Sequence, residues 1–131
     1  MPHVYKKRIC PHCNKEFRGN GKRYCSPQCS TDAGRMEKVN LWLEGKIDGR
    51  RGKTATGNYI KWYLKNERGE KCELCGWNEV NPYTGNIPIE LEHIDGDFTN
   101  NNIDNLKLIC PNCHSLTKTY KSLNKGKGRP R

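Results

Sequence analysis

The sequence contains few of the residues that build a large hydrophobic core. Only 33% of its 131 residues are apolar and 8% are aromatic. No stretch approaches the roughly 20 apolar residues that a membrane helix needs, so we expect no membrane partner. The first residues are polar, and we therefore expect no secretory signal. Such a chain is expected to form one domain or two very small ones, stabilised by crosslinks or bound metal.

Cysteine, by contrast, is plentiful: the eight cysteines fall into four close pairs. Without a secretory signal we expect a reducing compartment, where cysteines more often bind metal than form disulfides. Two such pairs supply the four thiolates of a tetrahedral zinc site. We therefore predict two structural Zn²⁺ sites. Their ligands are Cys10, Cys13, Cys25 and Cys29 for the first site and Cys72, Cys75, Cys110 and Cys113 for the second.

Charge is unevenly distributed along this basic chain. The formal net charge is +10, from 24 Lys and Arg against 14 Asp and Glu. Residues 1–30, 31–70 and 114–131 have net charges of +6, +3 and +6, whereas residues 71–113 have a net charge of −5. The basic flanks favour a polyanion such as nucleic acid as the partner. A divalent cation held beside phosphate would explain the acidic segment.

Composition and motif spacing divide the chain into four regions. Residues 1–30 are predicted to form a four-cysteine zinc knuckle, and residues 31–69 a helical and basic linker region. Residues 70–123 carry the strongest pattern and contain the second zinc site. Residues 124–131 (NKGKGRPR) contain no large apolar residue and are predicted to be a disordered basic tail.

Helices are predicted at the end of the first region and within the second. Ser26 is a suitable helix N-cap, because Pro27 follows it at the first helical position. Residues 31–44 also favour a helix. Residues 45–57 contain four glycines and are predicted to be a mobile basic linker. Residues 58–67 are predicted to form a helix whose apolar stripe belongs to the core.

The third region is predicted to contain a strand followed by a helix. Apolar and polar residues alternate over residues 87–92, which predicts a strand. The pattern becomes helical from Pro111 onward, with Asn112 as a possible cap. The strand lies within the 34 residues that separate Cys75 from Cys110. The second zinc site joins the segment before the strand to the start of this helix, so it would place the end of the strand opposite the first helical turn. Side chains at these two places are therefore expected to meet.

Three ionisable residues stand at these two places. Glu92 ends the predicted strand, His93 comes next, and His114 directly follows the last cysteine. His114 and Lys118 are four residues apart and would share one face of the predicted helix. Glu92, His93 and His114 could thus converge on one site.

Three blocks in this region resemble the motifs of the HNH endonuclease family. They are residues 91–96 (LEHIDG), residues 105–106 (NL) and residues 108–114 (LICPNCH). The resemblance covers about residues 71–121. It implies an α+β fold with a C-terminal ββα-metal (HNH or His-Me finger) module, beside the N-terminal zinc knuckle. The activity it implies is metal-dependent hydrolysis of DNA phosphodiester bonds.

The resemblance also implies a role for each matched residue. His93 would be the general base that takes a proton from the attacking water. Glu92 and His114 would hold a catalytic Mg²⁺ or Mn²⁺ ion. Asn105 would be structural, its amide bridging backbone groups so that the loop positions His93.

Two departures from the family pattern concern Glu92. Many relatives have Asp at this position, and the longer side chain changes the reach of the carboxylate. Adjacent strand residues also point to opposite faces, so Glu92 and His93 can serve one site only if the strand ends or twists there. If Glu92 faces away, Asp95 or Asp97 becomes the reserve ligand.

Basic residues outside the motif are predicted to contact DNA phosphates. The predicted contacts are Lys6, Lys7, Arg8, Arg18, Arg50, Arg51, Lys118 and Lys121. For any one of them, a solvated surface is the alternative. Their number favours double-stranded DNA as the partner.

The predicted protein is therefore an HNH endonuclease that nicks DNA as a monomer or weak homodimer, in the cytoplasm of a bacterial or phage-infected cell. One alternative is a zinc-dependent module that binds nucleic acid without cutting it, which leaves Glu92, His93 and His114 unexplained. Another is a protein-interaction module, which predicts exposed apolar patches rather than high charge. DNA affinity that falls steeply with salt would exclude the latter.

Overall fold

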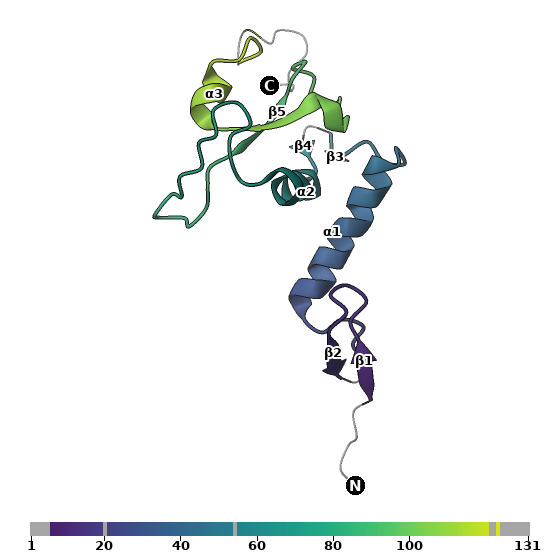
Figure 1. The fold of residues 1–131 in the computed structure, drawn as a ribbon. Coiled ribbons are helices and arrows are strands. Elements are labelled where there is room, and N and C mark those ends of the chain that lie inside the picture. Colours follow the sequence, from purple (N-terminus) through teal and green to yellow (C-terminus); the bar gives the residue numbers. More distant parts are fainter. Residues whose placement is uncertain (1–5, 20, 54, 121–122, 124–131) are drawn as a thin grey trace. The chain divides into compact units, whose positions relative to one another are not determined.

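The protein is described here from a computed structural model that covers residues 6–19, 21–53, 55–120 and 123. The predicted tail, residues 124–131, and Lys121 lie outside the described residues. The chain divides into two compact units, Met1–Asn40 and Leu41–Arg131. Helices and short antiparallel strands occur together, so the predicted α+β class is confirmed (Figure 1). Within the described residues, no helix has the length and apolar character needed to cross a membrane.

The first unit consists of a hairpin and most of a long helix. Strands β1 (Lys7–Ile9) and β2 (Glu16–Arg18) pair antiparallel, and α1 (Pro27–Leu43) follows. The Ser26 hydroxyl accepts a hydrogen bond from the Cys29 N–H at 3.1 Å, so the predicted cap is confirmed. The helix predicted for residues 31–44 is continuous with this start.

The predicted linker, residues 45–57, contains a hairpin. Strands β3 (Arg50–Arg51) and β4 (Ala55–Thr56) pair antiparallel. Gly49 precedes the hairpin with φ +82°, and its carbonyl accepts the Gly57 N–H at 2.8 Å. A Cβ atom at Gly49 would lie only 2.6 Å from Cδ1 of Ile60. Backbone conformation and crowding therefore both require glycine at this position.

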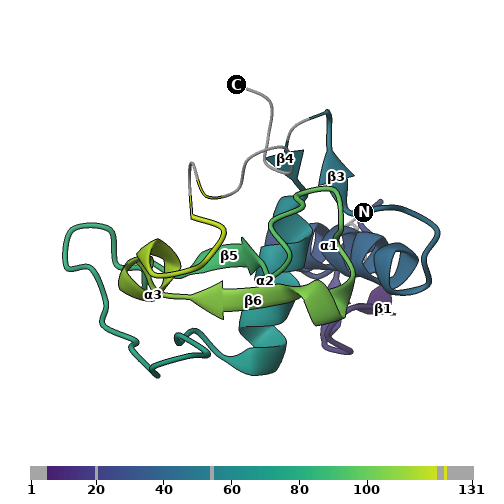
Figure 2. The ribbon, with the colours of Figure 1, turned by 90° about the horizontal axis from the view of Figure 1, so that it is seen from above.

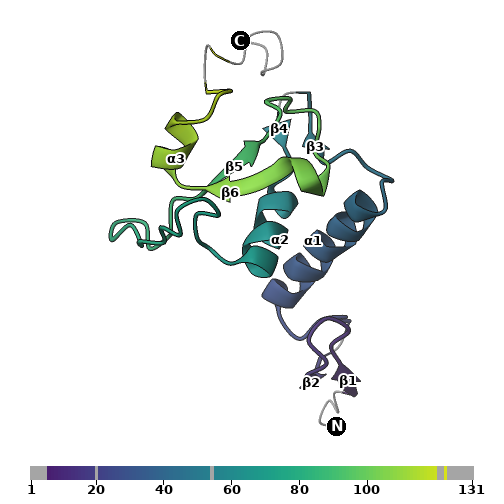
Figure 3. The same ribbon diagram turned by 45° about the horizontal axis from the view of Figure 1, so that its top comes forward.

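Helix α2 (Asn58–Arg68) confirms the helix predicted for residues 58–67. Its apolar stripe lies in the core, as predicted, because Ile60 and Leu64 are fully buried. The helix packs against β6 (Leu106–Ile109), on one side of the strand pair that β6 forms with β5 (Glu90–His93) (Figure 3). This contact forms the part of the hydrophobic core that supports the strand pair of the predicted site.

Strand β5 (Glu90–His93) pairs antiparallel with β6, and α3 (Pro111–Ser115) follows β6 directly (Figure 2). The predicted β-β-α order is therefore present. The strand begins at Glu90, so the prediction of residues 87–92 was wrong at its start. Pro88 has no N–H to donate, and the Ile89 N–H bonds back to the Ile87 carbonyl at 2.8 Å.

Helix α3 is shorter than its sequence pattern indicates. It ends at Ser115, so the prediction that His114 and Lys118 share a helix face was wrong. The Thr117 hydroxyl donates to the His114 carbonyl at 2.9 Å and the Thr117 N–H does so at 3.3 Å, which closes the helix. The predicted cap Asn112 was also wrong. The cap is Cys110, whose Sγ accepts the Cys113 N–H.

Candidate metal centres and active site

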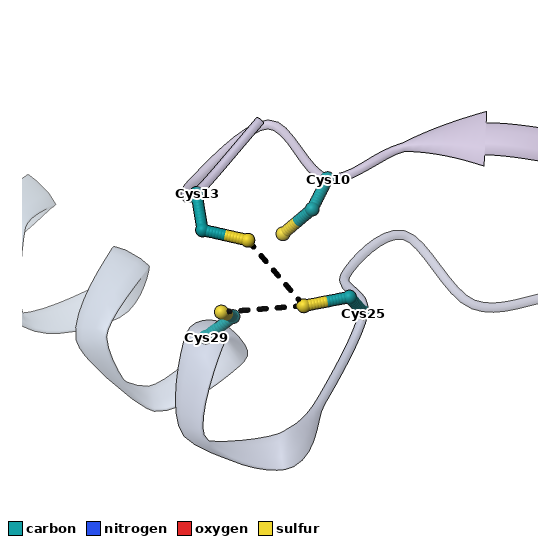
Figure 4. Close-up of side chains that lie close together, drawn as sticks. All are labelled: Cys10, Cys13, Cys25 and Cys29. Atoms are coloured by element: carbon teal, nitrogen blue, oxygen red, sulfur yellow. Dashed lines mark hydrogen bonds between the residues drawn. The ribbon is translucent and has the colours of Figure 1, made fainter. Parts of the chain in front are cut away.

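The four cysteines predicted for the first zinc site lie together in the N-terminal unit. The four Sγ atoms of Cys10, Cys13, Cys25 and Cys29 all lie within 4.8 Å of one another (Figure 4). Cys25 Sγ is 3.5 Å from the Sγ atoms of both Cys13 and Cys29. These separations exceed the roughly 2.05 Å of a disulfide. They approach the roughly 3.8 Å between two thiolates that each bind zinc at about 2.3 Å in a tetrahedron.

The second predicted zinc site lies in the C-terminal unit and has the same form. The Sγ atoms of Cys72, Cys75, Cys110 and Cys113 all lie within 4.8 Å of one another. Cys75 and Cys110 are 3.7 Å apart at sulfur. The first pair follows α2, and the second pair stands at the start of α3. The cluster thus fits zinc and fixes α3 relative to the strand pair.

Both clusters contain thiols with contrasting proton affinities. Burial raises the pKa of Cys10, but the backbone N–H groups of Cys13 and Cys25 outweigh it and lower the pKa to about 6. Hydrogen bonds with the side chains of Cys13 and Cys29 raise the pKa of Cys25 to about 12. The pKa of Cys72 in the second cluster is likewise lowered to about 6. Zinc must displace the protons that remain on the thiols, so the affinity for zinc is expected to fall as the pH is lowered.

Glu92 and His114 meet as the strand–helix juxtaposition predicts. Glu92 Oε2 lies 2.7 Å from His114 Nδ1, and the Thr119 hydroxyl donates to Glu92 Oε1 at 3.1 Å. Glu92 is only 8% exposed, and the ring of Tyr120 stands edge-on to His114 with centroids 5.4 Å apart. Two adjacent ligands of an octahedral ion, each at about 2.1 Å, would be about 3 Å apart. The pair fits a divalent ion with only a small adjustment.

Glu90 is an acidic neighbour that the sequence reasoning missed. Its Oε2 lies 3.7 Å from Nε2 of His114, on the side of the ring away from Glu92. Strand alternation puts Glu90 on the face of Glu92, and this could have revealed it. Among the described residues, only the two cysteine clusters bring three or more potential ligand atoms (His nitrogen, Cys sulfur or carboxylate oxygen) within 4.8 Å of one another. A single ion at Glu92 and His114 would therefore have other positions for water or phosphate.

His93, the last residue of β5, has contacts separate from those of Glu92 and His114. Its Nε2 lies 2.7 Å from Oδ1 of Asn101, a side chain that is only 4% exposed. Asn101 Nδ2 donates to the Asp48 carbonyl at 3.1 Å, and the Trp42 indole donates to the Asn101 carbonyl at 2.8 Å. Sequence reasoning treated Asn101 only as part of a polar loop. Nothing in its local pattern distinguishes it from its two asparagine neighbours.

Asn105 connects the turn after β5 to the start of β6. Its Oδ1 accepts the Asp95 N–H at 3.0 Å, and its Nδ2 donates to Asp95 Oδ1 and to the Asn100 carbonyl, both at 2.9 Å. The Ile94 N–H donates to the Asn105 carbonyl at 2.8 Å. This turn begins immediately after His93, so Asn105 fixes the end of the strand that carries the ring.

The two reserve carboxylates bind within this turn. Asp95 Oδ1 accepts the Asp97 N–H at 2.8 Å, and its Oδ2 accepts Asn100 Nδ2 at 2.8 Å. Asp97 Oδ1 accepts both the N–H and the hydroxyl of Thr99. Burial raises the pKa of Asp95, but the hydrogen bonds from Asn100, Asp97 and Asn105 outweigh it and hold the pKa below its usual value. Both carboxylates are therefore engaged by the loop itself.

The predicted phosphate contacts that the structure describes are all exposed. They are Lys6, Lys7, Arg8 and Arg18 in the first unit and Arg50, Arg51 and Lys118 in the second. Some already interact with protein groups: Lys7 lies 3.8 Å from Glu16, and Arg50 Nε donates to Asp48 Oδ2 at 2.8 Å. Their exposure leaves them accessible to a polyanion.

Comparison with known proteins finds one informative similarity. No family model and no solved structure matches the chain. Over 60 residues the chain is 52% identical to the H-N-H endonuclease F-TflIV of Escherichia phage T5. The aligned part covers 44% of this chain and 24% of the phage protein, so the chain spans about a quarter of the length of this curated relative. The match confirms, for this part of the chain, the predicted resemblance to the HNH endonuclease family.

Proposed function

We propose that this protein is a metal-dependent endonuclease that hydrolyses phosphodiester bonds of double-stranded DNA. The observation that carries the proposal is the 2.7 Å contact between Glu92 Oε2 and His114 Nδ1. Glu92 lies in the segment between the two cysteine pairs of the second cluster, and His114 follows the last of these cysteines. His93, next to Glu92, is the last residue of its strand. The similarity to a phage endonuclease supports the same activity. The protein would act in the cytoplasm of a bacterial or phage-infected cell.

In the proposed reaction, His93 accepts the proton of a water molecule that attacks the scissile phosphorus. An imidazole suits this step because its ordinary pKa, about 6.5, allows it to be neutral near physiological pH. The P–O bond to the leaving 3′ oxygen then breaks, and this oxygen takes a proton from solvent water. The products are a 5′ phosphate and a 3′ hydroxyl, as the family resemblance implies. Asn105 would keep His93 in place through the turn that follows it.

Glu92 and His114 would hold the catalytic divalent ion. Such an ion, when bound, neutralises charge on the phosphate and on the leaving oxygen. The Thr119 hydroxyl and the ring of Tyr120 orient the two ligands. Imidazole is a better ligand for Mn²⁺ than for Mg²⁺, which prefers oxygen. We therefore expect both ions to support cleavage and Mn²⁺ to be the better one.

Exposed cations of both units would bind the DNA backbone. Phosphate contacts of this kind position a duplex without reading its sequence. Each chain would carry one site of the Glu92, His93 and His114 type, so a monomer would cut one strand in each encounter. The first product from a plasmid would be the nicked circle.

The test is cleavage of a supercoiled plasmid by zinc-loaded protein. EDTA would also remove structural zinc, so the reaction without added Mg²⁺ or Mn²⁺ is the better metal-free control. We expect nicked circles only when Mg²⁺ or Mn²⁺ is added. His93→Ala should lower kcat about 10²- to 10⁴-fold, the usual contribution of a general base.

His12→Ala is the matched control, because His12 is a histidine of the other unit, 4.0 Å from Asp32. It should cleave like the parent protein. Equal cleavage by the His93→Ala variant would indicate a contaminant or a different base. Tight, salt-sensitive binding without cleavage under any metal would contradict the proposal and support a module that only binds nucleic acid.

A further inference from the structure

Asn101 is a buried amide that joins three separate segments of the C-terminal unit. Its carbonyl accepts the Trp42 indole N–H at 2.8 Å. Its Nδ2 donates to the Asp48 carbonyl at 3.1 Å, and its Oδ1 lies 2.7 Å from Nε2 of His93. With only 4% of the residue exposed, water has little access to these groups. Every polar group of this side chain thus has a protein partner.

The partners determine which way the amide is oriented. A backbone carbonyl can only accept a hydrogen bond, so the Asn101 atom that faces the Asp48 carbonyl must be the donor Nδ2. Oδ1 then faces His93, and an amide oxygen can only accept. The proton between the two side chains therefore belongs to Nε2 of His93. In the reversed orientation, Asn101 Oδ1 would lie about 3.1 Å from the Asp48 carbonyl oxygen, with no proton between the two oxygens.

The surroundings hold Asn101 in this orientation. A Cβ atom at Gly49 would lie 3.0 Å from the Asn101 Cβ and 3.3 Å from Cδ1 of Trp42, so the backbone at Gly49 packs closely against both. Trp42 is only 6% exposed. A hydrogen-bonded side chain in such a packed setting has little freedom to rotate. The amide can therefore orient a neighbouring ring before any substrate arrives.

We propose that Asn101 is the positioning residue of the general base: it fixes His93 as the tautomer protonated at Nε2 and leaves Nδ1 as the nitrogen that takes the proton from water. This inference rests on the proposed function. A neutral imidazole has one basic nitrogen, and a base must present that nitrogen to the water. Asn101, Asp48 and Trp42 all lie outside the three blocks that resemble the family. Together they connect the end of α1 and the segment after it to the ring of His93.

The first test is nitrogen-15 NMR of the histidine rings in the zinc-loaded full-length protein, above the ordinary histidine pKa of about 6.5. In the parent protein, we expect the His93 ring proton on Nε2 and protected from exchange with water. Asn101→Asp keeps an acceptor and should retain this proton signal, whereas Asn101→Leu should lose it. Asn102→Ala is the matched control, because the Asn102 side chain accepts from the Asp104 N–H instead.

The second test is plasmid cleavage by the same variants, after their zinc content and thermal unfolding have been compared. Asn101→Leu should lower kcat about 10- to 100-fold, as removal of an orienting partner usually does, with KM within about twofold. Asn101→Asp should restore part of the lost rate, because it keeps the acceptor for His93 but puts an oxygen opposite the Asp48 carbonyl. Asn102→Ala should behave like the parent.

Three results would overturn the inference. A His93 ring protonated at Nδ1 in the parent protein would do so even if no variant folds. So would Asn101→Leu cleaving at the parental rate, or cleaving slowly while the Nε2 proton stays protected, since the latter indicates a purely structural role. A parent protein with the expected proton that cleaves no DNA would instead contradict the proposed function, and the catalytic role of Asn101 with it.

Discussion

The two cysteine clusters have the same ligands and differ in what lies between their ligand pairs. Only 11 residues separate Cys13 from Cys25, whereas 34 separate Cys75 from Cys110. The short N-terminal segment contains β2 and returns directly to α1. The long C-terminal segment contains β5, the turn after it and β6. Its length allows a strand to be held against the helix that carries the last ligands.

We infer from this difference that a four-cysteine frame by itself would supply stability, and that reacting groups would come from the segment between its ligand pairs. In the second unit, the frame brings Glu92 to within 2.7 Å of His114, which follows the last cysteine. In the first unit, His12 lies between Cys10 and Cys13, and its ring is 4.0 Å from Asp32 of α1, a half-buried pairing. In the proposed account, the inserted segment would supply the groups that the reaction needs, and bound zinc would fix their distance.

The largest expected effect comes from removing one zinc ligand in each unit. Cys110→Ser should cost one zinc, unfold the β5–β6–α3 region and abolish cleavage, because structural zinc contributes on the order of 10 kcal/mol at neutral pH. Cys10→Ser should also cost one zinc but leave the Glu92–His114 contact intact. Zinc content, circular dichroism and plasmid cleavage at saturating enzyme would measure this. Equal loss of cleavage in both variants would contradict a separate role for the second frame.

A smaller effect is expected from two glycines that flank the β3 strand. Gly49 and Gly52 both have positive φ, +82° and +65°, so alanine at either should cost about 1–2 kcal/mol. Only Gly49 is crowded, by Ile60 and Asn101, and overpacking should add about 1–3 kcal/mol. Urea unfolding of the zinc-loaded variants would measure the difference. Equal costs would show that the segment around Gly49 is not tightly packed against Asn101.

The sequence predicts the features that depend on local spacing. Cysteine pairs identify both metal clusters, and the apolar periodicity identifies α2 with Ile60 and Leu64 in the core. The helix cap at Ser26 follows from the serine and the proline after it. In each case the responsible residues lie close together in the chain.

Features that depend on tertiary contacts were not predictable. His93 pairs with Asn101, and Asn101 with a carbonyl 53 residues away, a partner that no local pattern indicates. Three consecutive asparagines give no indication of which one turns inward. One local feature was also missed: α3 ends early because the Thr117 hydroxyl bonds to the His114 carbonyl. Apolar periodicity does not reveal such a side-chain hydrogen bond.

The smallest expected effects concern single phosphate contacts. Arg18→Ala should weaken DNA binding a few-fold and lower the slope of log affinity against log salt by about 0.9, the value for one released counterion. Arg50→Ala should change both less, because Arg50 already pairs with Asp48 at 2.8 Å. Fluorescence anisotropy of a labelled duplex across a salt series would measure both. A larger effect at Arg50 would reverse this ranking of the two arginines.

The most direct test of the central claim is a count of metal ions. The claim is that the second cysteine frame builds a separate site for a catalytic ion from Glu92 and His114. Zinc-loaded protein should hold two Zn²⁺ per chain and bind one further Mn²⁺, detected by electron paramagnetic resonance. Glu92→Gln and His114→Ala should lose the Mn²⁺ and keep both zinc ions. Unchanged Mn²⁺ binding in these variants would contradict the claim.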